Sequence, residues 1–197
     1  MVLNMKKMKT LFNRTFIGNH VANTVNEVTE GCEWVINGEG IATQKLDGTC
    51  CLIKDGKLFA RFDYKVGRKL PEGAIPCQKE PDAITGHFPH WVEVKDQPQY
   101  KWHKVVFENT IGLEDGTYEL IGVHFQNNPE KVERGDILVK HGSVVLEDVP
   151  RDFDGIKEYL RTHEIEGIVF HRGNGDMCKI KRTDFNFTWN GKTFKQH

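Results

Sequence analysis

The stretch that most constrains this chain covers residues 41–53, where Asp47-Gly48 separates two apolar, β-branched runs. Asp-Gly between two such runs is a strong short-range signal for a β-hairpin. Lys45 ends the first run, so the turn would present a lysine amine, a carboxylate and a bare glycine backbone together. Lysine can act as a covalent nucleophile where its surroundings disfavour protonation. The alternative is an ordinary solvated lysine on a strand, and this short motif alone does not decide between the two.

The rest of the chain is also rich in short apolar runs bounded by Asp-Gly, Asn-Gly and Gly-Asp turns, a pattern typical of antiparallel sheets. We expect an α+β domain over residues 31–197, preceded by a basic N-terminal arm over residues 1–30. Asp152 predicts the N-cap of a helix that ends near His163. Further strands are expected at residues 33–36, 50–54, 57–64, 87–94, 100–107, 117–123, 136–141, 143–146, 164–170 and 177–182. Three pairings are expected among them: a hairpin of 50–54 with 57–64 at Asp55-Gly56, a pair of 136–141 with 143–146 around Gly142, and a hairpin of 164–170 with 177–182.

Net charge limits the partners of the protein. The 197 residues carry a formal net charge of −1, so the whole molecule is not a polycation. A nucleic acid would have to be held by a local basic face, because phosphate contacts dominate that affinity. The candidates for such a face are the N-terminal arm and a basic rim at residues 61–69. The alternative for the rim is a solvent-exposed sheet edge whose charges prevent pairing with another strand.

Cysteine spacing argues against a zinc motif. The five cysteines form no Cys-x-x-Cys pair, and His87 and His90 lack a third ligand at a known spacing. We therefore expect reduced thiols and a soluble protein of the cytoplasm or nucleus, without a membrane span. The basic arm would also suit a mitochondrial presequence, which is the alternative location.

Two isolated carboxylates and a lysine pair add to Lys45. Glu119 lies within an apolar run, Glu166 precedes another, and Lys179 and Lys181 share one face of a predicted strand. A carboxylate in an apolar run needs a partner. Carboxylates that orient Mg²⁺, together with lysines that neutralise phosphate, suit phosphoryl chemistry on a nucleotide. Structural salt bridges are the alternative.

These residues fall into a recognisable order. The motifs are Lys45-Leu-Asp-Gly-Thr49, Arg61, Tyr118-Glu-Leu-Ile-Gly122, Glu166-Gly-Ile-Val169 and Lys179-Ile-Lys181. They resemble the motifs of the covalent nucleotidyltransferases, which include ATP-dependent DNA and RNA ligases and mRNA capping enzymes. Added segments such as Ala60-Arg-Phe-Asp63, Gly86-His-Phe-Pro89, Gln99-Tyr-Lys-Trp-His103 and His141-Gly142 resemble the vertebrate-type 5′–3′ RNA ligases. The resemblance extends from about residue 44 to residue 181.

The resemblance implies an antiparallel-sheet nucleotidyltransferase domain, ATP-grasp-like and without an OB-fold, that acts as an ATP-dependent RNA ligase. Lys45 would attack the α-phosphate of ATP to give lysyl-AMP. The AMP would pass to an RNA 5′-phosphate, and an RNA 3′-hydroxyl would displace it. Mg²⁺, with Mn²⁺ as a substitute, would be bound by Asp47, Glu119 and Glu166 through water, and the enzyme would be a monomer.

The resemblance also implies roles for other residues. Glu119 and Glu166 would serve the ribose and the metal, Gly48 would allow close approach to the substrate, and Arg61 would bind ribose or the RNA 5′-phosphate. The adenine would pack on Ile168 and be read at its edge by Gln44, whereas Lys179 and Lys181 would contact the α-phosphate. His141 is the candidate for the opposite face of the adenine.

Two features depart from the family pattern: the residue at position 44, and the lack of an obvious aromatic residue for the opposite face of the adenine. Related RNA ligases often carry an acidic residue where Gln44 stands, which puts adenine selectivity in question. The alternatives are a capping or DNA-joining nucleotidyltransferase and a non-catalytic module that binds nucleotides or RNA ends.

Overall fold

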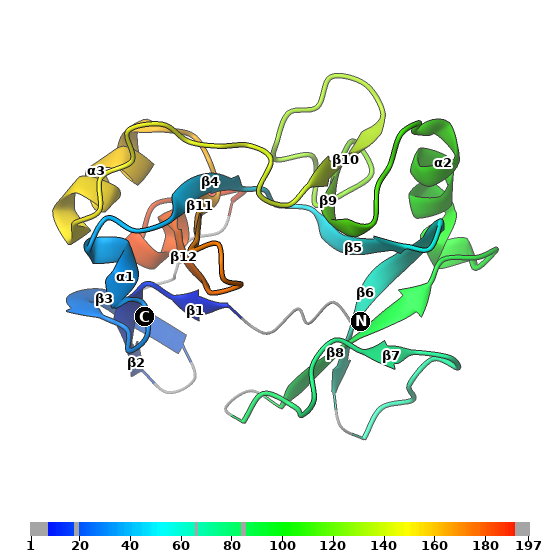
Figure 1. Ribbon diagram of the computed structural model, residues 1–197, viewed down its shortest axis with the longest axis horizontal. Helices are drawn as coiled ribbons and strands as arrows, with labels where there is room; N and C mark the ends of the chain where they lie inside the picture. The colour runs from blue at the N-terminus through cyan, green and yellow to red at the C-terminus, as the bar shows by residue number, and fades with distance from the viewer. Residues whose placement is uncertain (1–7, 18–19, 66, 84–85, 192–197) are drawn as a thin grey trace. The chain divides into compact units, whose positions relative to one another are not determined.

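The computed structural model describes residues 8–17, 20–65, 67–83 and 86–191 (Figure 1). These residues form two compact units. The central unit is the continuous segment Asp47–His141, and the terminal unit combines residues 8–46 with residues 142–191. In the described part of the chain, no helix is long and apolar enough to cross a membrane.

The central unit is built on a six-stranded sheet in the order β10-β9-β5-β6-β8-β7, and every pairing is antiparallel. Its strands are β5 (Thr49–Lys54), β6 (Lys57–Lys65), β7 (Ile75–Pro76), β8 (His87–Glu93), β9 (Gly116–Gly122) and β10 (Asp136–Lys140). Strands β5 and β6 form the predicted hairpin. Asp55 and Gly56 have φ of +51° and +69° there, and a two-residue turn of type I′ requires positive φ at both positions.

One helix covers this sheet. After a 3₁₀ turn, η1 (Pro98–Tyr100), the chain forms α2 (Lys101–Asn109). The strand predicted over residues 100–107 is therefore wrong. Tyr100, His103 and Val106 are buried at a spacing of three, which is helical, and Val106 packs on the sheet core beside Leu120. The aromatic and β-branched residues of this segment misled the sequence prediction because burial against the sheet decides the conformation.

The terminal unit holds a four-stranded sheet in the order β1-β12-β11-β4. Its strands are β1 (Lys9–Thr10), β4 (Ile41–Lys45), β11 (Gly167–His171) and β12 (Met177–Lys181), and a separate two-stranded ribbon joins β2 (Phe12–Ile17) to β3 (His20–Val28). Only the β1–β12 pairing is parallel within this sheet. The predicted hairpin of β11 and β12 is confirmed.

Helix α3 (Phe153–Thr162) packs on the core of the terminal unit, as the sequence predicts. The Asp152 carboxylate caps it and accepts a hydrogen bond from the Gly155 amide at 2.8 Å. Ile156 and Leu160 are fully buried in the same apolar cluster as Phe170. The mixture of antiparallel sheets with few helices confirms the α+β class, whereas the nucleotidyltransferase fold stays a prediction.

Two predictions in the terminal unit are wrong. Residues 33–36 form a short helix, α1 (Glu33–Ile36), and not a strand, because the Cys32 carbonyl accepts a bond from the Val35 amide and starts a helical turn. Residues 143–146 do not pair with β10 but lie against β4. The Gln44 amide donates to the Val144 carbonyl at 2.9 Å, and the Leu146 amide donates to the Ala42 carbonyl at the same distance.

The hairpin predicted at Asp47-Gly48 is also wrong. Strand β4 belongs to the sheet of the terminal unit and β5 to that of the central unit, so the two strands do not pair. Neither Asp47 nor Gly48 has the positive φ that a tight hairpin turn requires. Gly48 is needed for another reason: a Cβ placed on it would lie 2.3 Å from the Leu120 carbonyl oxygen.

A disulfide bond joins Cys32 to Cys178 within the terminal unit. It corrects the expectation that all five cysteines are reduced; Cys50, Cys51 and Cys77 are free and buried. The two bonded residues are 146 positions apart, so no sequence spacing could reveal the pair. The boundary expected at residue 30 stays a prediction, although Leu11 and Phe12 are buried in the core of the terminal unit.

Candidate functional site

Three predicted lysines share one face of the sheet in the terminal unit. Lys45 and Lys181 pair in register with the same residue, Gly167, from the two sides of β11. Lys179 lies two residues before Lys181 and therefore points to the same face. Gly167 leaves no side chain between Lys45 and Lys181. A Cβ there would also lie 2.3 Å from the Ile180 carbonyl oxygen, so the close backbone contact requires glycine.

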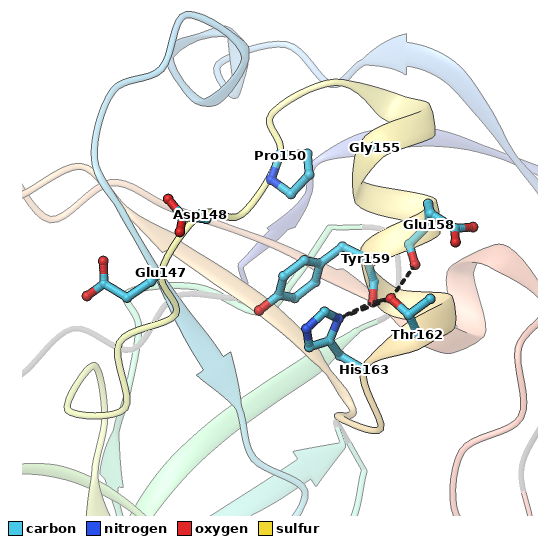
Figure 2. A pocket seen from close by; sticks show the side chains of 8 residues that line it. All are labelled: Glu147, Asp148, Pro150, Gly155, Glu158, Tyr159, Thr162 and His163. Carbon is cyan, nitrogen blue, oxygen red and sulfur yellow. Dashed lines mark hydrogen bonds between the residues drawn. The ribbon is translucent and has the colours of Figure 1, made fainter.

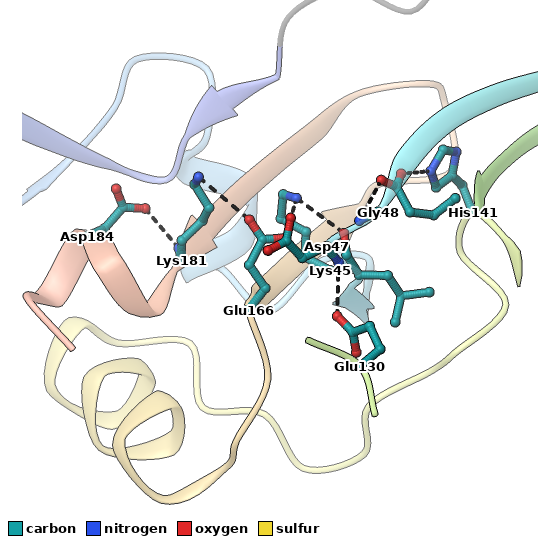
Figure 3. Close-up of polar contacts among 10 residues, drawn as sticks. Lys45, Asp47, Gly48, Glu130, His141, Glu166, Lys181 and Asp184 are labelled. Atoms are coloured by element: carbon teal, nitrogen blue, oxygen red, sulfur yellow. Dashed lines mark hydrogen bonds and ion pairs between the residues drawn. The ribbon is translucent and has the colours of Figure 1, made fainter. Parts of the chain in front are cut away.

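Glu166 joins two of these lysines. The Lys45 Nζ lies 2.5 Å from Glu166 Oε2, and the Lys181 Nζ lies 3.6 Å from Oε1 of the same carboxylate. Figure 3 shows both ammonium groups directed at this carboxylate. Its side chain is only 9% exposed. Because the carboxylate is shielded from water, its attraction for the ammonium groups is stronger than on an open surface.

The ammonium group of Lys179 has a lowered pKa. Burial lowers its pKa to about 8, and repulsion from Lys45 and Lys181 adds to the shift. The Glu166 and Asp184 carboxylates oppose the shift without cancelling it. The lysine face therefore carries positive charge that its own carboxylates do not fully compensate, and an anion would be favoured there.

Asp184 orders the end of β12, and the sequence analysis missed it. Its carboxylate is 2% exposed, accepts a hydrogen bond from the Lys181 amide at 2.8 Å and lies 3.6 Å from an Arg14 guanidinium nitrogen. The 3₁₀ helix η2 (Arg182–Phe185) holds this aspartate. The only sequence signal is an aspartate three residues after Lys181, which is too common to single out.

Gln44 and Ile168 are the residues expected to contact adenine. Each follows or precedes a residue of the lysine face by one position, so their side chains lie on the opposite face of the same sheet. The two residues pair in register, and Ile168 is fully buried in the apolar core. No exposed surface of Ile168 is left for a ligand, so its contact with adenine remains an unsupported prediction. Val169, 8% exposed, lies on the lysine face beside Lys179. Strand alternation could have identified Val169 as a residue of the lysine face if the orientation of β11 had been known.

The central unit holds the second group of predicted residues. Glu119 lies on β9, where it accepts a hydrogen bond from the Gly48 amide at 3.1 Å. Its second oxygen lies 2.9 Å from the His141 Nε2. These contacts supply the partners that a carboxylate in an apolar run requires. His141 is therefore placed against Glu119, while its stacking on adenine stays a prediction.

Asp47 lies at the start of the central unit. Its amide donates a hydrogen bond to Glu130 Oε1 at 2.9 Å (Figure 3). Glu130 belongs to a loop between β9 and β10 and was not identified from the sequence. The contact fixes the backbone just before Gly48. Arg61 lies on β6 with its Nε 3.5 Å from an Asp63 carboxylate oxygen, and it is more than one-third exposed.

The side chains proposed to bind a metal are thus divided between the units. Asp47 and Glu119 belong to the central unit, and Glu166 belongs to the terminal unit. Carboxylate oxygens are suitable ligands for Mg²⁺, directly or through water. Cys50 pairs in register with Glu119 on β5 and β9. Burial raises the pKa of its thiol to about 12.

A pocket of about 450 Å³ in the terminal unit involves none of the predicted residues. Figure 2 shows the Tyr159 ring beside the His163 imidazole, and the two rings stack 3.9 Å apart. Glu147, Asp148 and Glu158 also line the pocket. Their negative charges oppose phosphate binding, so this pocket is a poor candidate for a nucleotide site.

Comparison with known proteins supports the resemblance of the sequence motifs to those of RNA ligases. The family profile described as RNA ligase 1 matches residues 110–195. RNA ligase 1 of Rattus norvegicus and of Mus musculus is each 27% identical over 222 aligned positions, covering 76% of this chain and 68% of the relative. RNA ligase 1 of Danio rerio is 27% identical over 221 positions, covering 75% and 68%. The chain is thus close in sequence to the vertebrate-type RNA ligases, as its motifs predict.

Proposed function

We propose that this protein is an ATP-dependent RNA ligase that joins an RNA 5′-phosphate to an RNA 3′-hydroxyl through a lysyl-AMP intermediate. The observation that carries the proposal is the Lys45 Nζ held 2.5 Å from Glu166 on the same sheet face as Lys179 and Lys181. Sequence similarity to RNA ligase 1 proteins supports it.

The first step needs a neutral amine at Lys45. The lone pair of Nζ attacks the α-phosphorus of ATP, a P–N bond forms, the bond from the α-phosphorus to the bridging oxygen breaks, and pyrophosphate leaves. The amine loses its protons to the surroundings. Lys179 and Lys181 disfavour protonation of Lys45, whereas Glu166 favours it, so release of Lys45 from Glu166 would activate the nucleophile.

The same lysine face suits the phosphates. Two ammonium groups on one strand, spaced two residues apart, can neutralise the negative charge that develops on the α-phosphate and the leaving pyrophosphate. Phosphate binding would in turn favour the protonated form of Lys179, whose pKa is lowered to about 8.

We propose Mg²⁺, with Mn²⁺ as a substitute, as the metal cofactor, because carboxylates are among the predicted site residues. Asp47, Glu119 and Glu166 would serve the ion through water, because hard cations take oxygen ligands. When bound, the ion would supply charge neutralisation at the phosphates. Glu119 would also contact the ribose. Gln44 would contact the edge of the adenine, and Arg61 would bind the ribose or the RNA 5′-phosphate.

Two later steps complete the reaction. An oxygen of the RNA 5′-phosphate attacks the lysyl-AMP phosphorus, the P–N bond breaks, and the leaving nitrogen takes up a proton from the surroundings to regenerate the amine of Lys45. The 3′-hydroxyl of the second RNA end then attacks the activated 5′-phosphate, its proton is lost, and AMP leaves. We propose that the enzyme acts as a monomer on both ends; sedimentation of the active species tests this.

Covalent labelling tests the first step. Wild type, Lys45→Ala and the exposed strand variant Lys57→Ala are incubated with Mg²⁺ and ATP labelled at the α-phosphate, or with GTP in parallel, and separated under denaturing conditions. We expect label from ATP on wild type and Lys57→Ala, and none on Lys45→Ala. Label from GTP would favour a capping enzyme instead. No label on folded, unadenylylated wild type would favour the non-catalytic binding module.

Joining assays test the substrate. RNA carrying a 5′-phosphate and a 3′-hydroxyl should be sealed, while the same RNA with a 5′-hydroxyl should not. Preference for the matching DNA ends would contradict the assignment to RNA while leaving the lysyl-AMP step intact.

A further inference from the structure

Three chemically different donor groups meet in the central unit. Cys50 on β5 and Glu119 on β9 are direct partners in the antiparallel ladder, so their side chains lie on the same face. His141 directly follows β10, the strand beside β9. One donor atom from each residue, a sulfur, an oxygen and a nitrogen, lies within 4.8 Å of the other two.

His141 faces the Glu119 carboxylate through one of its two ring nitrogens. One ring nitrogen, Nε2, lies 2.9 Å from Glu119 Oε2. The other, Nδ1, is buried without a hydrogen-bond partner among the residues that the structure describes. A buried polar atom without a partner is costly and uncommon in native proteins. Because the two ring nitrogens point to different sides of the imidazole, Nδ1 is directed away from Glu119, and Nε2 is the nitrogen that a metal beside Glu119 would bind (Figure 3).

Cys50 is available for coordination. Its thiol is free, while Cys32 and Cys178 are bonded to each other. The residue is 8% exposed, whereas the His141 and Glu119 side chains are 29% and 14% exposed, so a bound metal would meet water on their side. Neighbouring Cys51 is buried in the cluster on the opposite face of the sheet, with Leu120.

The donor set selects the kind of metal. Thiolate, imidazole and carboxylate together are typical ligands of Zn²⁺, which binds four ligands tetrahedrally, whereas Mg²⁺ and Ca²⁺ prefer oxygen alone. Bond lengths of about 2.0–2.3 Å place two tetrahedral ligands about 3.3–3.8 Å apart. The three donors need to close by at most about 1.5 Å to meet that geometry, a shift within the reach of side-chain rotation.

We propose that Cys50, Glu119 and His141 form a binding site for Zn²⁺ with a fourth position open to water. The site shares Glu119 with the proposed Mg²⁺ ligands and differs from them in using a thiolate and an imidazole. If the proposed ligase function is correct, Zn²⁺ at this site engages Glu119 and His141 and thereby inhibits formation of lysyl-AMP.

Cobalt provides the direct test, because Co²⁺ bound to a thiolate gives a sulfur-to-metal charge-transfer absorption in the near ultraviolet. The full chain is freed of metal, its Cys32–Cys178 bond is verified by mass spectrometry, and Co²⁺ is added. We expect the absorption in wild type and in the control Cys51→Ala, its loss in Cys50→Ala, and its displacement by Zn²⁺.

A second variant tests the site without relying on the Cys50→Ala substitution. His141→Gln should retain the fold and weaken Zn²⁺ binding, measured by calorimetry, by about tenfold or more, since loss of even an outer-shell partner costs about 10–100-fold. Absence of the absorption in wild type, its persistence in Cys50→Ala, or an unchanged affinity in His141→Gln would each overturn the site.

The inhibitory role has a separate readout. Zn²⁺ added with excess Mg²⁺ should reduce lysyl-AMP labelling of wild type. Charge transfer with undiminished labelling would overturn the inhibition while the metal site stands. Failure of all labelling without Zn²⁺ would overturn the ligase proposal alone, because the cobalt absorption does not depend on activity.

Discussion

The two units hold their charged residues in different ways. In the terminal unit, three lysines share one sheet face, and burial together with mutual repulsion lowers the pKa of Lys179 to about 8. In the central unit, the Glu119 carboxylate is held by a backbone amide and an imidazole. The first arrangement keeps positive charge that an anion can neutralise, whereas the second already satisfies its carboxylate.

The two units also differ in how far they depend on contacts between distant segments of the chain. The described residues of the terminal unit come from two distant segments of the chain and include the disulfide bond, while the described residues of the central unit all fall within residues 47–141. Loop closure restricts an unfolded chain most when the closed loop is long. The stability of the terminal unit should therefore respond more strongly to the loss of single links.

The largest effect is expected from reducing the Cys32–Cys178 bond. It closes a loop across 146 positions, so its loss should lower the free energy of unfolding by about 2–5 kcal/mol. Urea unfolding of the oxidised and the reduced full chain measures the change. Hydrogen exchange resolved by peptide should show faster exchange in the terminal unit; equal acceleration in both units would contradict the comparison.

A smaller effect is expected from neutralising Glu166. Glu166→Gln leaves two ammonium groups facing each other without their carboxylate and should cost about 2–3 kcal/mol of stability, less than a fully buried pair because both lysines are partly exposed. Glu119→Gln is the matched variant in the central unit. Its amide oxygen can still accept from the Gly48 amide, so we expect about 1 kcal/mol. Urea unfolding that ranked Glu119→Gln above Glu166→Gln would refute this order.

The cost of burying Lys179 should depend on pH. Its pKa is about 8 in the folded protein and about 10.4 when unfolded, so below pH 8 both states are protonated and the folded state carries the full penalty. Between pH 8 and about 10.4 the unfolded state binds more protons, so the stability of the wild type rises with pH.

Lys179→Met removes this penalty. We expect the variant to be more stable than wild type at pH 7 by about 1–2 kcal/mol and the gain to vanish near pH 10. Lys157→Met, an exposed lysine of α3, is the control and should show no such pH dependence. Urea unfolding at several pH values decides; a gain that stays constant from pH 7 to pH 10 would exclude titration of Lys179 as its cause.

The smallest effect concerns the helices of the two units. Helix α3 has a side-chain cap from Asp152, whereas α2 has no side-chain hydrogen bond at its N-cap residue Tyr100. Asp152→Ala should lower stability by about 1 kcal/mol. It should also speed exchange in the first turn of α3, and Asp154→Ala serves as the control. Exchange that stays slow in α3 would show that packing of Ile156 and Leu160 alone holds the helix.

Local signals predicted much of the fold. The Asp55-Gly56 hairpin, the Asp152-capped helix and the hairpin of β11 with β12 follow from turn chemistry, capping and alternation within a few residues. Long-range partners caused the errors. Residues 143–146 pair with β4, and α2 is fixed by the sheet that it covers, neither of which the neighbouring sequence can encode.

The candidate site shows the same contrast between what local sequence predicts and what long-range pairing decides. The sequence alone determined the residue types in each motif, since Lys45, Glu119, Glu166 and the lysine pair stand out by charge within apolar runs. Only the tertiary structure decided which of them meet. It joined Lys45 to Glu166 and Glu119 to His141, and it added Cys50 beside Glu119. The physical reason is that a strand's sequence fixes which residues share a face, whereas strand pairing, chosen by the whole core, fixes which faces come together.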